Sequence, residues 1–164
     1  MELDRTRLPR AGVDVGVDTE PLEPGEELWS RLEASLELFG VDASVTPELL
    51  RLEQQVFGPA GKRWFGVRDE RGTVISMASL ILLEDVGYVD HVVTFPSSRR
   101  RGFASALTSR LSREALGAGA THVSLLADPD RGSTIAMYER LGFRRSGTLA
   151  STKGPVPQIA GGGS

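Results

Sequence analysis

The segment Pro96–Ser105, which reads PSSRRRGFAS, combines positive charge with small residues and is the part of the chain best suited to hold an anion. Arg99–Arg101 supply the charge, while Gly102 and Ala104 leave the main chain open to a bulky ligand. If a helix begins here, its first N–H groups have no intrahelical partners and its dipole adds partial positive charge. The segment predicts a phosphate site, although a solvated basic turn before an ordinary surface helix would have the same composition.

Two short patterns, in order along the chain, resemble those of one known family. The pattern R-x-x-G-x-A at Arg99–Ala104, with Pro96 shortly before it, is similar to the acetyl-CoA-binding motif of GNAT acetyltransferases. The later segment Met137–Phe143, MYERLGF, is similar to that family's Y-x-x-x-G-F segment and follows at the expected distance. Hairpin signals at Trp64–Val67 and Val74–Ala78 extend the resemblance across residues 26–150.

The resemblance implies acetyl-CoA as the acyl-donor cosubstrate and indicates how the chain would hold it. Backbone N–H groups of Arg100 to Ser105 would bind the pyrophosphate, and the main chain of Val92–Thr94 would pair with the pantetheine arm. N–H groups on that same strand could stabilise the oxyanion of an acyl-transfer reaction. The cofactor-binding residues predicted in this way are Val92, Val93, Thr94, Arg99, Arg100, Arg101, Gly102, Phe103, Ala104 and Ser105.

Transfer of an acyl group from a thioester to an amine requires a proton donor for the departing thiolate. A phenol can hydrogen-bond the sulfur and donate its proton, and the family often has a tyrosine at the position of Tyr138, which is the predicted general acid. Without the resemblance, a tyrosine near the end of an amphipathic helix is more often a core residue whose hydroxyl reaches the rim.

The reaction also requires a neutral amine, and Asp90 is the predicted catalytic proton acceptor. Strand alternation places it on one face with Tyr88, Val92 and Thr94, just upstream of the expected cofactor edge. Tyr88, Glu84 or a chain of waters are alternatives, and a carboxylate on an edge strand usually faces solvent.

The first half of the chain predicts two helices and three strands. Apolar residues recur at helical spacing over Glu26–Phe39, and Gly40 supplies a stop. A second helix begins at Thr46-Pro47 and runs to the break at Gly58-Pro59. Three strand-like runs with short turns between them predict an antiparallel meander, over Arg63–Arg68, Val74–Leu83 and Tyr88–Phe95.

The second half predicts a βαβ unit and two further elements. A helix over residues 103–116 ends at Gly117–Gly119, a strand follows at His122–Leu126, and a helix at Ser133–Leu141 precedes a last strand at Phe143–Ser151. The order ααβββαβαβ predicts an α/β (mixed α+β) fold with a mixed, mostly antiparallel sheet and helices on both faces. By the resemblance, this is the GNAT fold.

The 164 residues fit one domain, which we expect at 25–152 as an acyl-CoA N-acyltransferase domain. Residues 1–24 read as loose chain in which Val13–Val17 could add a strand, and residues 153–164, ending in GGGS, read as a flexible, linker-like tail. The chain shows one strand fewer than relatives usually have at their ends, and Val13–Val17 or a partner in a homodimer could fill that edge. Arg131 stands where many relatives carry asparagine, so the cofactor contact there stays open.

Composition narrows the function classes. A net charge of −3 and a pI near 5.5 argue against a nucleic-acid partner. The chain has no cysteine, and its two histidines, His91 and His122, are too few for a histidine-rich metal site. His91 is expected to face away from Asp90 and to serve in packing. No signal peptide and no apolar run of membrane-spanning length is visible, so we expect a cytoplasmic location and no membrane partner.

The favoured hypothesis is an N-acetyltransferase that moves an acetyl group from acetyl-CoA to a primary amine of a small molecule or protein. One alternative is a catalytically silent acyl-CoA-binding or regulatory domain, which would keep the anion site without a working proton acceptor. A nucleotide- or RNA-binding module is the third reading, and the acidic pI and few aromatic residues oppose it.

Overall fold

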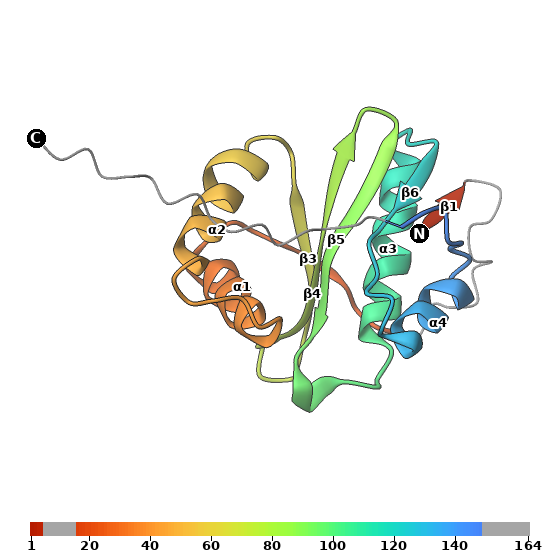
Figure 1. Cartoon of the computed structure of the whole chain (residues 1–164). Helices are drawn as coiled ribbons and strands as arrows, with labels where there is room; N and C mark the ends of the chain where they lie inside the picture. Colours follow the sequence, from red (N-terminus) through yellow and green to blue (C-terminus); the bar gives the residue numbers. More distant parts are fainter. Residues whose placement is uncertain (5–15, 149–164) are drawn as a thin grey trace, which may run out of the picture.

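The computed structural model describes residues 1–4 and 16–148, and its helices lie on both faces of one sheet (Figure 1). Within these residues the sheet has six strands in the order β1-β6-β5-β4-β3-β2. Helices α1 and α2 cover one face, and α3 and α4 lie on the other (Figure 1). The elements are β1 Glu2–Asp4, β2 Glu20–Leu22, α1 Glu26–Leu38, α2 Thr46–Leu52, the π-helical turn η2 Glu53–Phe57, β3 Arg63–Arg68, β4 Val74–Leu83, β5 Val86–Thr94, the 3-10 turn η3 Pro96–Ser98, α3 Phe103–Gly117, β6 His122–Ser124 and α4 Gly132–Arg140.

The centre of the sheet is the antiparallel meander β3-β4-β5 that the sequence predicts. The crossover through α3 then places β6 parallel to β5, and the two strands pair only over Val86–Tyr88 and His122–Ser124. Beyond Tyr88 no further pairing of β5 with β6 is found among the described residues. The main chain of β5 therefore has an unpaired edge from Val89 to Thr94.

A β-bulge interrupts β5 where this edge begins. Met77 of β4 pairs with Val93 and Ser79 pairs with Asp90, so Ala78 faces two residues of β5, His91 and Val92. His91 adopts a φ of 54°, a left-handed conformation that is uncommon for a residue other than glycine. One extra residue reverses the alternation of side chains beyond it, so the residues before and after the bulge do not share faces as a regular strand would.

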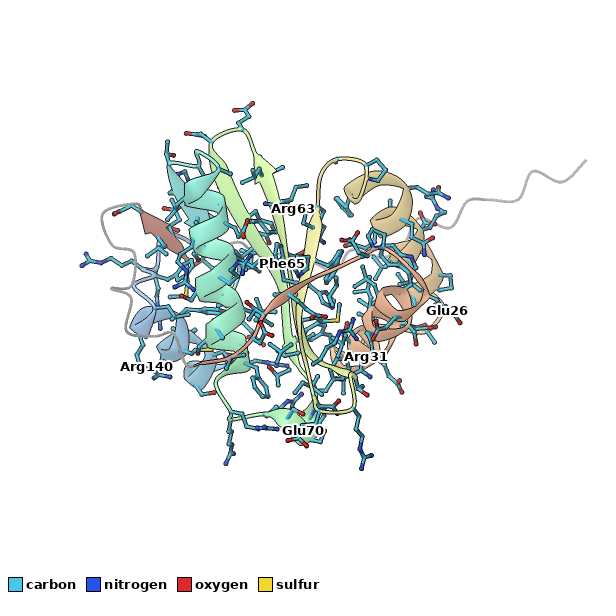
Figure 2. All side chains as sticks on the ribbon, turned by 180° about the vertical axis from the view of Figure 1, so that it is seen from behind. Glu26, Arg31, Arg63, Phe65, Glu70 and Arg140 are labelled. Carbon is cyan, nitrogen blue, oxygen red and sulfur yellow. The ribbon has the colours of Figure 1, made fainter. Side chains whose placement is uncertain are left out.

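Each face of the sheet buries its own apolar cluster within the described part of the chain. Leu107 and Leu111 of α3 pack with Val89 and Phe65, while Leu28 and Leu32 of α1 belong to the second cluster. Figure 2 shows Phe65 on the α3 side of the sheet and Arg31 on the α1 side. The helical spacing read from the sequence thus corresponds to the faces that the helices bury, which confirms the predicted fold class.

The edges of the sheet differ from the prediction. The prediction of a last strand at Phe143–Ser151 is wrong over the described residues 143–148. In that range only Arg144 forms a bridge, an isolated one with Glu2. The edge beside β6 is instead taken by β1, whose Leu3 is 1% exposed. At the opposite edge β2 pairs with β3 although it contains Pro21, which an edge strand tolerates because one side of its main chain is unpaired.

The expectation of loose chain over residues 1–24 is therefore wrong at β1 and β2. Each strand has three residues, too few to display an alternating pattern. The suggested strand at Val13–Val17 lies largely outside the described residues, and residues 16–19 within them form no strand. Among the helices in the described ranges, none is long and apolar enough to cross a membrane.

Candidate active site

The loop before α3 presents a row of backbone donors. Arg100 has a φ of 63° and Gly102 a φ of 82°, and this alternation turns successive N–H groups toward one side of the chain. The first helical hydrogen bond is donated by Ala106 to the carbonyl of Gly102, at 3.0 Å. No acceptor is found among the described residues for the six N–H groups from Arg100 to Ser105. A multiply charged anion would satisfy several of them at once.

The same loop opens on a cleft of about 770 Å³ whose lining is strongly basic. Five arginines and one acidic residue, Asp130, are found among the lining residues that the structure describes. Arg99 donates from Nε to the carbonyl of Thr94 at 3.0 Å, and Arg101 stacks on Phe103 with its guanidinium carbon 4.9 Å from the ring centre. The five arginines are Arg99, Arg100, Arg101, Arg131 and Arg140.

Arg131 and Arg140 reach the cleft from the two ends of α4. Arg131 lies immediately before the helix and forms an exposed ion pair with Asp128, at 3.4 Å. Arg140 is the last residue of the helix, and it lies far from α1 in Figure 2. No carboxylate within ion-pair distance of Arg140 is found in the described ranges. Sequence reasoning missed Arg140, because a basic residue in the last turn of a helix usually has no role beyond favouring the helix dipole.

The predicted strand residues Val92, Val93 and Thr94 line this cleft together with the loop. Val93 is buried in the α1-side cluster, and the hydroxyl of Thr94 lies 2.8 Å from that of Ser76. The unpaired main-chain edge of Val92–Thr94 therefore belongs to a strand whose side chains are held in place by the core and by β4. An extended ligand segment could add to such an edge by main-chain hydrogen bonds.

Tyr138 lies in the same cleft with its ring largely buried. The ring packs edge-on against Phe143, with centroids 5.9 Å apart. Burial, with a smaller contribution from the negative charge of Asp90, raises the pKa of Tyr138 to about 12. The phenol is therefore protonated at neutral pH, as a proton donor must be. Tyr138 is thus a buried core residue that also lines the cleft, so its burial does not exclude the predicted role as general acid.

Asp90 does not line the cleft, and the prediction that it shares a face with Val92 and Thr94 is wrong. The bulge at His91 reverses the alternation, so Val92 packs on the α3 side while Asp90 contacts Lys62, with Nζ and Oδ2 3.2 Å apart. The charge of Asp90 is the smaller of the two causes that raise the pKa of Tyr138, after burial. Asp90 lies next to the unpaired edge of β5, on the side of the sheet that α1 and α2 cover.

His91 lies on the α1 side of the sheet. Its Nε2 is 2.5 Å from the hydroxyl of Ser35, which itself donates to the carbonyl of Leu32, so the imidazole nitrogen is the donor to Ser35. The rings of Phe39 and Trp64 meet it edge-on. Burial lowers the pKa of His91 to about 4, so the side chain is neutral and packed. The prediction that it faces away from Asp90 does not hold, because both side chains contact groups on this side.

The alternative proton acceptors occupy different positions. Tyr88 is on β5 at the last pairing with β6, and burial, followed by the charge of Asp90, raises its pKa. Glu84 lies in the turn between β4 and β5, and the strand from Val86 to Asp90 alone spans about 13 Å. Among the described residues no group of three histidine, cysteine, aspartate or glutamate side chains could hold a metal ion.

Comparison with known proteins places this cleft in a family. The family described as "Acetyltransferase (GNAT) family" matches residues 26–143. An acetyltransferase of Yersinia pestis is 28% identical over 85 residues, which are 52% of this chain and 60% of that protein. The chain therefore spans less than two thirds of that relative's length.

Solved structures share the fold. An acetyltransferase from Trypanosoma brucei aligns with a TM-score of 0.67 and 24% identity, covering 83% of this chain and 98% of that one. A predicted acetyltransferase from Clostridium acetobutylicum, solved with acetyl-CoA, aligns with a TM-score of 0.66 and 16% identity, covering 82% and 96%. Because the family match extends from α1 to the end of the Tyr138 segment, the chain belongs to the GNAT family of acetyltransferases.

Proposed function

We propose that this chain is an N-acetyltransferase that uses acetyl-CoA as donor and a primary amine of a small molecule or protein as acceptor. The observation that carries the proposal is the row of six N–H groups at the start of α3 that have no acceptor within residues 1–4 and 16–148. This row opens on the same cleft as Tyr138 and the edge of β5 beyond Tyr88. A solvated basic turn would not need to converge with these other two features.

Acetyl-CoA is complementary to the cleft in charge and in hydrogen-bonding groups. Its pyrophosphate would accept from the N–H groups of Arg100 to Ser105, and the arginines would neutralise its charge. Its pantetheine arm carries amides that can pair with the main chain of β5 beyond Tyr88. This fit supports residues Val92–Thr94 and Arg99–Ser105 as the cofactor-binding set.

The chemistry follows from the side chains around the open edge. The acceptor nitrogen attacks the thioester carbon, and N–H groups of β5 stabilise the oxyanion of the tetrahedral intermediate. The carbon–sulfur bond then breaks, and the thiolate takes the phenolic proton of Tyr138, which solvent replaces. The proton of the acceptor nitrogen leaves to Asp90 or to water. The net products are the acetylated amine and free CoA.

The test is free-thiol release from acetyl-CoA across a panel of amines, amino-acid N-termini and aminoglycosides, with wild type and Tyr138→Phe compared. We expect one acceptor class to accelerate release and Tyr138→Phe to slow it about a hundredfold, because general-acid catalysis contributes on that scale. Calorimetry should give the same acetyl-CoA affinity for both proteins. Binding without stimulation by any acceptor would instead identify a silent acyl-CoA-binding domain.

A further inference from the structure

Lys62 is a buried cation whose role the acetyl-CoA cleft does not account for. It lies just before β3, on the α2 side of the sheet, and its side chain is only 5% exposed. Its Nζ is 2.6 Å from Oε1 of Glu53 and 3.2 Å from Oδ2 of Asp90. The rings of Phe57 and Trp64 lie 5.2 Å and 5.1 Å from the same nitrogen. Buried lysines are rare because desolvation penalises the charge, so this one calls for a specific partner.

The carboxylate of Glu53 is only partly hydrogen-bonded, which by itself lowers the stability of the fold. Its second carboxylate oxygen, Oε2, is buried and finds no hydrogen-bond partner within the described residues. Glu53 begins the π-helical turn η2, in which Gly58 donates to its carbonyl at 2.9 Å. Short π-helical segments are rare in proteins, and those that occur often lie at functional sites. The turn brings this carboxylate to the buried ammonium rather than to solvent.

Asp90 is the exposed end of this chain of contacts. Its side chain is 42% exposed, and its other oxygen, Oδ1, has no hydrogen-bond partner in the described ranges. Asp90 lies two residues beyond Tyr88, where β5 and β6 cease to pair, and immediately before the bulge. Lys62 therefore fixes Oδ2 of Asp90, while Oδ1 remains available where β5 ceases to pair with β6.

We propose that Lys62 and Glu53 are positioning residues for the proton acceptor: Glu53 fixes the ammonium of Lys62, and Lys62 fixes Oδ2 of Asp90 so that Oδ1 receives the proton of the acceptor amine. This inference rests on the proposed acetyl transfer. The proton moves from the attacking nitrogen to Oδ1 and then to solvent, so Lys62 keeps its proton throughout. The other titratable groups near Asp90 are Tyr88 and His91 on its own strand, and the charge of Asp90 also contributes to the raised pKa of Tyr138 on α4.

The chain offers a clean chemical test because it contains no cysteine. Lys62→Cys removes the ammonium, and alkylation of that cysteine with 2-bromoethylamine in denaturant, followed by refolding, restores a lysine-like ammonium at the same position. Arg51→Cys, treated identically, is the matched control, because Arg51 is an exposed cation on α2 whose partners are Glu48 of that helix and Gln55 of η2. Thermal unfolding of each protein establishes that it is folded.

We expect Lys62→Cys to lower kcat about tenfold, part of the 10²–10⁴ typical of a general base, and to leave KM for acetyl-CoA within about twofold. The acid limb of its pH profile should move up by about half to one pH unit, because a half-exposed carboxylate that loses its neighbouring cation takes up a proton more readily. Aminoethylation should reverse both changes. The two forms of Arg51→Cys should match wild type.

A second readout works without turnover. The carboxyl ¹³C resonance of Asp90, assigned by its loss in Asp90→Asn, is titrated in wild type, Lys62→Cys and the aminoethylated protein. A midpoint that rises in Lys62→Cys and returns on aminoethylation supports the contact even if no acceptor stimulates thiol release, which would overturn only the proposed activity. Identical titrations in all three proteins, or an acid limb that stays in place in Lys62→Cys, would overturn the positioning role.

Discussion

Gly102 has a left-handed backbone conformation on which the proposed anion site depends. Its φ of 82° is accessible to glycine at no cost, and an alanine there would be strained by about 1–2 kcal/mol. We predict that Gly102→Ala weakens acetyl-CoA binding about tenfold, because relief of the strain would turn the N–H row away from one side. Calorimetric titration measures this.

The control for Gly102→Ala is Gly72→Ala. Gly72 has a similar φ of 81° but lies in the turn between β3 and β4, outside the lining of the cleft. It should lose comparable stability and keep the wild-type affinity. Equal affinity losses in the two variants would mean that strain, and not the loop, weakens binding.

His91 should make stability depend on acidity. Burial lowers its pKa to about 4, below the usual 6.5, so the folded state holds the neutral ring. The contribution is complete above pH 6.5 and is lost as the pH falls toward 4, because the unfolded chain then binds a proton that the folded chain excludes. We predict a loss of about 3 kcal/mol over this window relative to His91→Gln. Denaturant unfolding at pH 7, 5.5 and 4 measures it, and parallel curves for the two proteins would contradict it.

At the residue scale, the sequence anticipated that Arg99–Ser105 lie together at one cleft, but it did not anticipate the surroundings of Asp90. Arg99–Ser105 are contiguous, so their convergence at a helix start follows from local chemistry. The contact between Lys62 and Asp90 joins residues 28 positions apart and depends on a bulge that only the register with β4 reveals. A lysine before a strand has no local feature that distinguishes it from a solvated one.

At the scale of elements, β5 packs tightly against α3 at Gly87. A Cβ built on Gly87 would lie 2.4 Å from the Cβ of Ala115, closer than two carbons can approach. We predict that Gly87→Ala destabilises the fold by about 1–3 kcal/mol, the usual range for overpacking. Thermal or denaturant unfolding measures the change.

Two variants separate this contact from a general effect of alanine. Ala115→Gly, added to Gly87→Ala, should recover part of the loss although glycine itself weakens α3 by about 1 kcal/mol. Gly117→Ala, at the end of the same helix, meets nothing within 4 Å and should be neutral or slightly stabilising. No recovery in the double variant would show that the cost of Gly87→Ala arises elsewhere.

Long elements with a strong period were predicted well, and short ones were not. The bounds of β3 and β4 agree with the prediction, and α1, α3 and α4 differ from it by a residue or so at their ends. The second helix was expected to continue to Gly58, but its last turn is π-helical, which apolar spacing cannot reveal. The strands β1 and β2 depend on partners far along the chain, so no local pattern announces them.

At the scale of the whole molecule, the site is divided between the two faces of the sheet. The arginine-lined cleft opens among β5, α3 and α4, whereas Lys62, Glu53 and Asp90 contact one another on the α2 side. β5 contributes residues to both faces, and its bulge at His91 and Val92 changes which side chains point to each face. The residues proposed to bind the acyl donor and those proposed to serve the acceptor therefore lie on opposite faces of the sheet and meet at β5.

The closure of the sheet by β1 can be tested through Leu3. This side chain is 1% exposed in the α3-side core, and β1 covers the edge of β6. We predict that Leu3→Ala lowers the free energy of unfolding by about 2–5 kcal/mol, as other large-to-small core changes do. Loosening β1 would also expose the β6 edge and favour self-association, which light scattering after size-exclusion chromatography would detect.

Leu83→Ala, at a 52% exposed position in β4, should change neither property. Acetyl-CoA affinity should survive Leu3→Ala under folding conditions, because β1 lines no part of the cleft, and a parallel loss of affinity would show that this edge strand supports the site as well as the sheet.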